Sequence, residues 1–303
     1  MSIEEFMKRV LILLVLLVGL GSQVQAKNDV PKCGKDTKIG DLCTINVREL
    51  HPTQFAVGMD EVWCRKKDLE SMDQNELNDY LANSKRRVPI VRGLDNTFYL
   101  TDHHHLAVAL YNARLKNPNQ QLYAVLKEDF SNSKNPQEFW HKMRQHQPNP
   151  YVWLKDNTGI SQPPTELPTQ LQSMTDDPMR TLSAWVRDSC GYIKCDKHKC
   201  ARNYKEVTCA PESTYFLELY WADYLRKVNG VKQAMGEHAE CNNQNDLDKG
   251  TCVSEQYSKL VKAFPAAMQA VTSQEAKEAL GEGYGYNAKA PKGISPPQDC
   301  SGD

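Results

Sequence analysis

Ten cysteines constrain the fold of this chain more than any other feature of its sequence. Their number is even, and none of them lies in the first 26 residues. An even set of cysteines in the exported part of a chain is typical of a disulfide framework formed in an oxidising compartment. We therefore expect a crosslinked protein. The cysteines are Cys33, Cys43, Cys64, Cys190, Cys195, Cys200, Cys209, Cys241, Cys252 and Cys300.

The pairing of these cysteines cannot be read from their spacing. Local pairs are candidates, namely Cys33–Cys43, Cys200–Cys209 and Cys241–Cys252. A metal site around His198 is the alternative, built from the cysteines between residues 190 and 209. Zinc-binding cysteine pairs usually enclose two to four residues, and Cys190–Cys195 and Cys195–Cys200 enclose four each, at the upper limit of that range, so the fit is poor. The spacing favours disulfides.

The first 26 residues have the organisation of a secretory signal peptide. Lys8 and Arg9 precede an apolar run at residues 10–20, which is shorter than the roughly 20 residues of a membrane-spanning helix. Val24 and Ala26 place small residues at the −3 and −1 positions of a cleavage site. We expect an exported protein, periplasmic or secreted, without a stable membrane span after cleavage. An uncleaved membrane anchor is the alternative.

The balance of acidic and basic residues limits the kinds of partner that this chain can bind. Lys and Arg total 37 and Asp and Glu total 38, for a net charge of −1. A nearly neutral chain has no dominant electrostatic footprint for nucleic acid or anionic membrane, so any such binding must be local. The hydrophobic content of 40% is typical of a folded protein.

The expected elements change in character along the chain. The first part mixes strands and helices, and a proline-rich stretch at residues 161–168 is followed by helices only. Expected strands lie at 43–47, 88–91, 97–100, 122–126 and 151–154, the second and third forming a hairpin, with a turn at 51–54. Expected helices lie at 60–69, after Asp73, from Thr101 and Asp102, and at 136–143, 168–174, 178–188, 215–228 and 254–280, the last kinked at Pro265.

The most informative segment is YLTDHHHLA at residues 99–107, where an expected strand meets an expected helix. The first turn of a helix has free N–H groups and a partial positive charge, which favour a bound anion. Imidazole exchanges protons near neutral pH, and Asp102 can cap the helix or orient a His. Successive helical residues point about 100° apart, so His103, His104 and His105 cannot all face one site. The alternative is a cluster that only caps and packs.

A second candidate segment lies at residues 51–61. Thr53 and Gln54 can hydrogen-bond a substrate beside His51, and Asp60 or Glu61 can act as a base or hold a divalent cation such as Mg²⁺ or Mn²⁺. The alternative is structural, because turn residues satisfy their own backbone and acidic side chains favour a helix start.

Four blocks of the sequence share a pattern with a known family. They are LHPTQFAVGM at 50–59, VPIVRG at 88–93, YLTDHHHLA at 99–107 and DDPMRTLSAWVRD at 176–188. Together they resemble the family called putative ParB-like nucleases, in the ParB/sulfiredoxin superfamily, over about residues 44–230. The resemblance implies an α+β fold, a small mixed sheet with helices, in which the turn at 102–105 grips phosphate. An α-helical extension follows here.

The resemblance does not choose a reaction, because superfamily members include DNA clamps, kinases, sulfiredoxins and claimed nucleases. No Cys lies between Cys64 and Cys190 to act as the sulfiredoxin nucleophile, and His103 and Leu106 stand where a Gly and a phosphate-binding Arg occur in the broader pattern. We expect a signal peptide at 1–26, a ParB/sulfiredoxin-like α+β domain at 27–160, a helical, disulfide-rich extension at 161–280 and an irregular tail at 281–303.

Our principal hypothesis is an exported hydrolase of nuclease or phosphodiesterase type, whose partner is a phosphate-containing ligand or nucleic acid. His104 would be the acid/base, Asp102 its orienter or the helix cap, and Glu61 a base or cation ligand. Substrate contacts would come from His51, Thr53, Gln54, His103 and His105. The alternative is a non-catalytic binding module on the same fold. A nucleotide-dependent phosphotransferase ranks third, since an exported protein rarely meets ATP.

Overall fold

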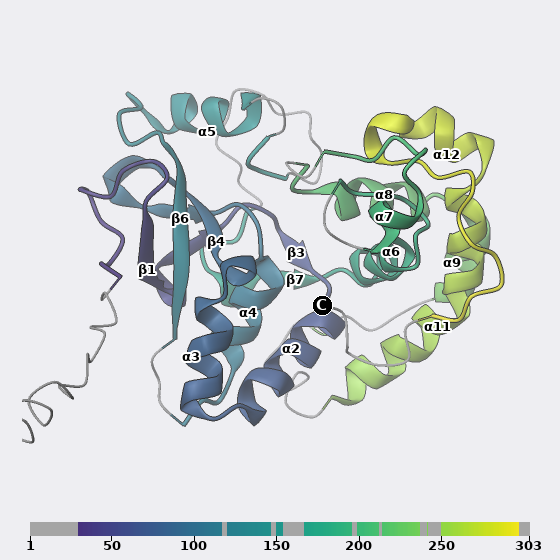
Figure 1. The fold of residues 1–303 in the computed structure, drawn as a ribbon, viewed down its shortest axis with the longest axis horizontal. Coiled ribbons are helices and arrows are strands. Elements are labelled where there is room, and N and C mark those ends of the chain that lie inside the picture. The colour runs from purple at the N-terminus through teal and green to yellow at the C-terminus, as the bar shows by residue number, and fades with distance from the viewer. Residues whose placement is uncertain are drawn as a thin grey trace, which may run out of the picture. The chain divides into compact units, whose positions relative to one another are not determined.

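A five-stranded mixed sheet organises the first half of the chain (Figure 1). The computed structural model describes residues 30–116, 120–146, 150–153, 167–195, 199–211, 214–236, 241 and 250–296. The expected signal peptide and Cys300 lie outside these residues. The strands, in sheet order, are β1 (Leu42–Asn46), β6 (Gln121–Asp129), β4 (Val88–Arg92), β5 (Phe98–Leu100) and β2 (Leu50–Pro52).

Pairing in this sheet brings the two candidate segments side by side. β4 pairs antiparallel with β5, which confirms the expected hairpin, and parallel with β6. β1 pairs antiparallel with β6. β2 pairs parallel with β5, so that His51 lies opposite Tyr99 and Pro52 opposite Leu100. Because parallel strands end at the same edge, the chain leaves β2 and β5 at neighbouring points.

Four helices accompany the sheet, namely α2 (Met59–Ser71), α3 (Gln74–Ala82), α4 (His104–Asn112) and α5 (Pro136–Gln145). The helices expected at 60–69 and 136–143 are confirmed, and Asp73 begins α3 with a capping box. α4 is buried from His104 to Leu110 and packs against α2. Its apolar residues join those of the sheet in one hydrophobic core, which includes Ile90, Leu100 and Leu122.

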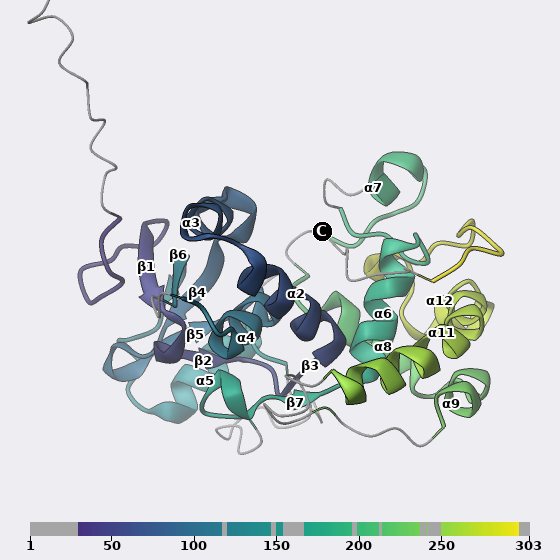
Figure 2. The same cartoon turned by 90° about the horizontal axis from the view of Figure 1, so that it is seen from below.

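The second half of the described chain is mainly helical (Figure 2). Its helices are α6 (Pro178–Asp188), α7 (Lys199–Asn203), α8 (Leu217–Leu225), α9 (Asn229–Met235), α11 (Thr251–Val271) and α12 (Gln274–Ala279). α6 packs against both α8 and α11. A second hydrophobic core forms there around Trp221 and Phe264. A two-stranded parallel pair, β3 (Ala56–Val57) and β7 (Thr175–Asp176), joins the chain just before α2 to the chain just before α6.

Several expected elements are wrong. β2 occupies part of the expected turn at 51–54. The helix expected at 168–174 is one 3-10 turn, Leu171–Ser173, followed by β7. Residues 151–153 form no strand. The last long helix passes through Pro265 and stops at Val271, because Ser273 caps α12 by accepting the Ala276 N–H. The other 3-10 helices are Val47–Glu49, Ser84–Arg86, Leu94–Asn96 and Glu282–Tyr284.

Disulfides crosslink both halves of the described chain. The bonds are Cys33–Cys43, Cys190–Cys200, Cys195–Cys209 and Cys241–Cys252. Cys64 is disulfide-bonded as well. Two expected local pairs are confirmed, whereas Cys200–Cys209 is wrong, because Cys200 lies against the end of α6 where Cys190 reaches it. The disulfides indicate an oxidising, exported environment. None of the described helices has both the length and the apolar character that crossing a membrane requires.

Candidate functional site

A cavity of about 190 Å³ opens where α2, α4 and α6 meet. Its wall combines the beginnings of α2 and α4, the length of α6, Lys194, and the segment that leads into α8. Residues of the expected α+β domain and of the expected helical extension therefore share one cleft.

The turn at residues 101–106 forms one wall of this cleft. The helix expected from Thr101 and Asp102 begins later, at His104, and its N-cap residue is His103 in the left-handed region at φ 61°. Asp102 is therefore not the helix cap; its carboxylate accepts the N–H of His103 at 2.7 Å. In the described part of the chain, the N–H groups of His104, His105 and Leu106 have no recorded acceptor. Free N–H groups of this kind suit an anion.

His104 is sealed within the protein, although its residue borders the cleft. Its side chain is 3% exposed, and Nε2 accepts the backbone N–H of Thr53 at 3.2 Å. Burial lowers the pKa of His104 to about 3, so the ring is neutral at physiological pH. Thr53 is fully buried and its hydroxyl donates to the Leu100 carbonyl at 2.7 Å. This geometry favours a positioning role for His104 over the acid/base role expected from sequence.

His105 makes the equivalent bond one residue later. Its Nε2 accepts the N–H of Gly58 at 3.0 Å and lies 3.4 Å from Oε2 of Glu61. Burial holds the pKa of His105 well below its usual range. Since the ring is neutral and the Nε2 lone pair receives the Gly58 N–H, the contact with Glu61 is not an ion pair. His104 and His105 thus attach the chain between β2 and α2 to the start of α4.

The start of α2 forms the opposite wall. Its N-cap residue, Gly58, offers no side-chain cap. A Cβ on Gly58 would lie 2.1 Å from Oγ1 of Thr181, so glycine allows α2 and α6 to approach closely here. The N–H of Met59 donates to Oδ1 of Asp176 at 3.0 Å. Contacts from distant parts of the sequence, rather than a local cap, therefore support the beginning of α2.

Asp60 is the most unusual group in the cleft. Its side chain is 8% exposed, and among the described residues it has no recorded hydrogen bond or ion pair. Burial, with smaller contributions from the charges of Glu61 and Asp176, raises the pKa of Asp60 to about 7. A carboxyl with that pKa can both accept and donate a proton near neutral pH.

Two of the four Lys and Arg side chains that line the cleft are paired with acidic neighbours. Arg180 lies 3.4 Å from Glu61 and 4.0 Å from the buried Glu218. Arg187 pairs with Glu218 and, at 3.3 Å, with Asp188. Burial opposes ionisation of Glu218, but the charges of Arg187 and Arg180 hold its pKa well below its usual range. These pairs are fixed parts of the wall.

Two further cations in the cleft, Arg65 and Lys194, have no recorded ion pair within the described chain. Both charges, after the larger effect of burial, contribute to lowering the pKa of His103. Two cations without a recorded ion pair thus line the same cleft as the open N–H groups of α4, together with the carboxylate of Asp102.

The structure brings together Asp60 and six other residues expected at the site, and leaves two outside it. Gln54, Glu61, Asp102, His103, His104 and His105 border the cleft. The amide of Gln54 already donates to the Ala56 carbonyl at 2.6 Å. Thr53 is buried beside the cleft, and His51 packs on Tyr99 with ring centroids 5.5 Å apart. Neither of these two lines the cavity.

Sequence reasoning missed three functional candidates of the wall. Arg180 falls in the fourth family-like block, but no feature of the sequence assigned it a role in binding, and Arg65 falls in no block. Lys194 lies between two cysteines, which is a signal for crosslinking but not for substrate binding.

No group of three or more His, Cys, Asp or Glu side chains in the described residues is arranged to hold a metal ion. Glu61, expected as a cation ligand, is engaged by Arg180. A magnesium ion in a phosphoryl-transfer site often uses only one or two carboxylates together with substrate phosphates. Asp60 and Asp102 are the carboxyls of the cleft for which no ion pair is recorded among the described residues.

Comparison with known proteins gives a match to a family model and matches to solved structures. The family model described as putative ParB-like nuclease matches residues 43–227. The crystal structure of protein Atu1540 from Agrobacterium tumefaciens is similar with a TM-score of 0.51 and 26% sequence identity, covering 80% of this chain and 95% of that one. No protein of curated function matches. All residues that line the cleft lie within the range of the family match.

Proposed function

The chain belongs to the putative ParB-like nuclease family, and from this premise we propose that it is an exported hydrolase of phosphodiesters or related phosphorylated compounds. The reaction takes place in the cleft between α2, α4 and α6. The observation that carries the proposal is Asp60, a buried carboxyl without a partner in the described chain and with a pKa near neutrality, in a cavity that also holds unpaired cations.

The substrate phosphate binds at the start of α4. Three backbone N–H groups, the positive end of the helix and the side chain of Arg65 offer complementary charge and donors. The ring of His103, for which no partner is recorded in the described residues, is the imidazole that a substrate can reach. These features support phosphate binding more strongly than any single motif does.

Asp60 acts as the general base. It takes a proton from water as the water oxygen forms a bond to phosphorus. The bond between phosphorus and the ester oxygen then breaks, and that oxygen takes up a proton from solvent. Groups in such a role contribute roughly 10²- to 10⁴-fold to rate. His104 and His105 position the chain before α2, and Glu61 orients Arg180.

The test is turnover by the purified, disulfide-bonded protein. Single- and double-stranded DNA and RNA, and bis(p-nitrophenyl) phosphate, are assayed with Mg²⁺, with Mn²⁺ and with a chelator. Asp60→Asn should lower turnover at least about 100-fold. Asp68→Asn, on the exposed side of the same helix, is the matched control and should match the wild type. Equal turnover by Asp60→Asn and wild type would remove Asp60 from the mechanism.

Binding without catalysis is the second outcome that the assay distinguishes. If phosphorylated compounds raise the melting temperature of the protein while no substrate is turned over, the cleft is a binding site and the protein a binding module. Transfer of phosphate from ATP would instead support a phosphotransferase.

A further inference from the structure

The segment that follows α6 is crosslinked more densely than any other in the described chain. Two disulfides, Cys190–Cys200 and Cys195–Cys209, interleave within 20 residues. Lys194 lies between the first cysteines of the two bonds and lines the cleft. No family-like block identified in the sequence includes it.

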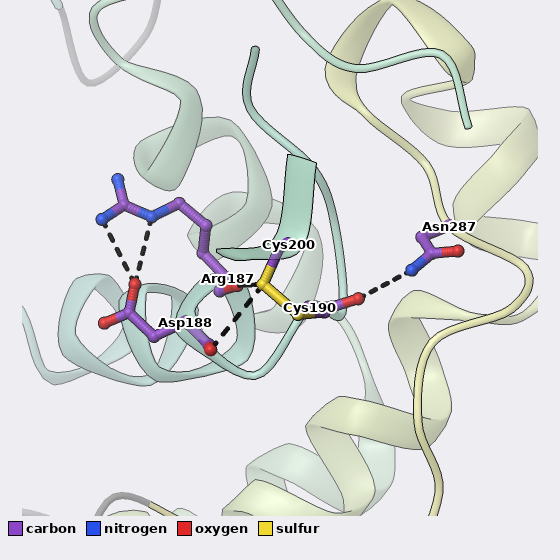
Figure 3. Close-up of a disulfide and its surroundings, with 5 residues drawn as sticks. All are labelled: Arg187, Asp188, Cys190, Cys200 and Asn287. Atoms are coloured by element: carbon purple, nitrogen blue, oxygen red, sulfur yellow. Dashed lines mark hydrogen bonds and ion pairs between the residues drawn. A yellow bond between two sulfur atoms is a disulfide. The ribbon is translucent and has the colours of Figure 1, made fainter. Parts of the chain in front are cut away.

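The segment is fixed at its beginning by the end of α6 (Figure 3). Cys190 adopts the left-handed conformation at φ 62°, and the N–H groups of Cys190 and Gly191 donate to the carbonyls of Arg187 and Val186 at 2.8 Å each. This is a Schellman ending, in which the left-handed residue is usually glycine. Asn287 donates to the Cys190 carbonyl at 2.8 Å.

The first disulfide packs directly on the helix end. Sγ of Cys200 lies 3.6 Å from the Arg187 carbonyl and 3.8 Å from that of Asp188. A disulfide sulfur carries no hydrogen, so these are packing contacts rather than hydrogen bonds. They keep the helix end in place, and Arg187 and Asp188 at that end line the cleft together with Lys194.

The backbone around Lys194 is held from both sides. The N–H of Ile193 donates to the Gly285 carbonyl at 2.8 Å, and the N–H of Cys195 donates to that of Ala210 at 2.7 Å. Ala210 in turn donates to Ile193 at 2.8 Å. The position of Lys194 therefore depends on bonds to its immediate neighbours and on the second disulfide.

No ion pair within 4 Å is recorded for Lys194 in the described chain, although its charge helps to lower the pKa of Glu218, which is already paired with Arg187 and Arg180. The lysine side chain is half-buried. Arg180 and Arg187, by contrast, are committed to Glu61, Glu218 and Asp188. A lysine whose backbone is fixed at a cleft that also contains free helix N–H groups, and whose nearest acid is already paired with two arginines, is arranged for an anionic ligand.

We propose that Lys194 is a substrate-binding residue, which contacts a phosphate oxygen of the ligand seated at the start of α4, and that the two interleaved disulfides set its position. This inference rests on the proposed phosphate site and adds a contact from outside the sequence blocks that resemble the family. It also predicts that reduction of this segment weakens substrate binding.

The test measures binding, so that it does not depend on catalysis. Affinity for inorganic phosphate and for thymidine 5′-monophosphate is measured by calorimetry on the oxidised protein. Lys194→Ala should weaken binding about tenfold, the loss of one charge-assisted hydrogen bond, and Lys194→Arg should recover most of it. Lys205→Ala, an exposed lysine in the same crosslinked segment, is the control and should leave affinity unchanged.

A second pair of variants tests the disulfide. The Cys195→Ser/Cys209→Ser protein should bind phosphate several-fold more weakly than wild type, whereas the Cys33→Ser/Cys43→Ser protein, which lacks a bond at β1, should not. Equal affinity of Lys194→Ala and wild type would overturn this inference and leave the proposed function standing. Absence of phosphate binding by the wild type would overturn the phosphate site, and this inference with it.

Discussion

The beginnings of α6 and α2 are both acidic, but they are built in opposite ways. At α6, Asp177 caps the helix by accepting the N–H groups of Met179 at 3.0 Å and Arg180 at 3.3 Å, and it pairs with Arg226. At α2, Asp60 has no recorded partner in the described chain, and its pKa is raised. The acid at α6 stabilises its helix, whereas the acid at α2 is held in an unfavourable state at a cleft.

The support for the two helix starts differs as well. α6 is capped by the residue next to it. α2 relies on His105 and Asp176, which accept the N–H groups of Gly58 and Met59 from 47 and 117 residues away. Because distant residues support the start of α2, the carboxyl of Asp60 is not needed as a cap and is available for chemistry.

The largest effect should follow from His105→Ala. The change leaves the buried N–H of Gly58 without an acceptor and creates a cavity, which together should lower the free energy of unfolding by about 3 kcal/mol. Urea unfolding followed by circular dichroism measures it. His141→Ala, an exposed histidine on α5, serves as the control. A loss below about 1 kcal/mol would mean that α2 does not need this remote acceptor.

A smaller effect should follow from Asp177→Ala, which removes the local cap of α6. We expect a loss of about 2 kcal/mol in the same unfolding measurement. Asp177→Asn should keep most of the stability, because asparagine also caps well and the pair with the half-exposed Arg226 contributes little. If Asp177→Asn were as damaging as Asp177→Ala, the ion pair rather than the cap would hold this helix.

The smallest effect is the pH dependence that Asp60 gives to the free energy of unfolding. The pKa of Asp60 is about 7 in the folded protein against an ordinary value of 3.8, so between these values the folded state binds the proton more strongly. Stability contributed by this proton is present below pH 3.8 and is lost as pH rises toward 7, by about 1 kcal/mol per pH unit.

Comparing Asp60→Asn with wild type isolates this contribution, because the buried histidines, whose pKa values are lowered, act in the opposite direction in both proteins. The variant should gain stability relative to wild type as pH rises from 5.5 to 6.5. A constant difference across that range would show that Asp60 is ionised throughout.

Local signals in the sequence predicted the elements whose ends are locally determined. Asp177 followed by Pro178 marks the start of α6, and the expected range 178–188 is the observed one. The hairpin of β4 and β5 was also predicted from local signals in the sequence. The late start of α4 was not, because His103 adopts a left-handed conformation that favours glycine and that only the surrounding fold maintains.

The sequence predicted where the candidate site lies, but not which of its residues has which role. The HHH stretch does reach the cleft. His104 and His105 are buried there because they accept the N–H groups of Thr53 and Gly58, about 50 residues away in sequence, and the sequence does not reveal these contacts. The acid with the raised pKa owes that shift to burial, which is a property of the folded protein. Lys194 could not be identified from the sequence, because disulfides set its position. The spacing of the cysteines does not determine how they pair.

The interleaved bonds after α6 also bear on how the protein matures. Four cysteines can join in three ways, and here the native choice links the first with the third and the second with the fourth. Oxidation of nearest neighbours would trap an incorrect isomer that must be reshuffled by thiol exchange. Protein made in a reducing cytosol should therefore be reduced, and should form mixed isomers when it is oxidised in air after purification, whereas coexpression with a disulfide isomerase in an oxidising compartment should yield the homogeneous form.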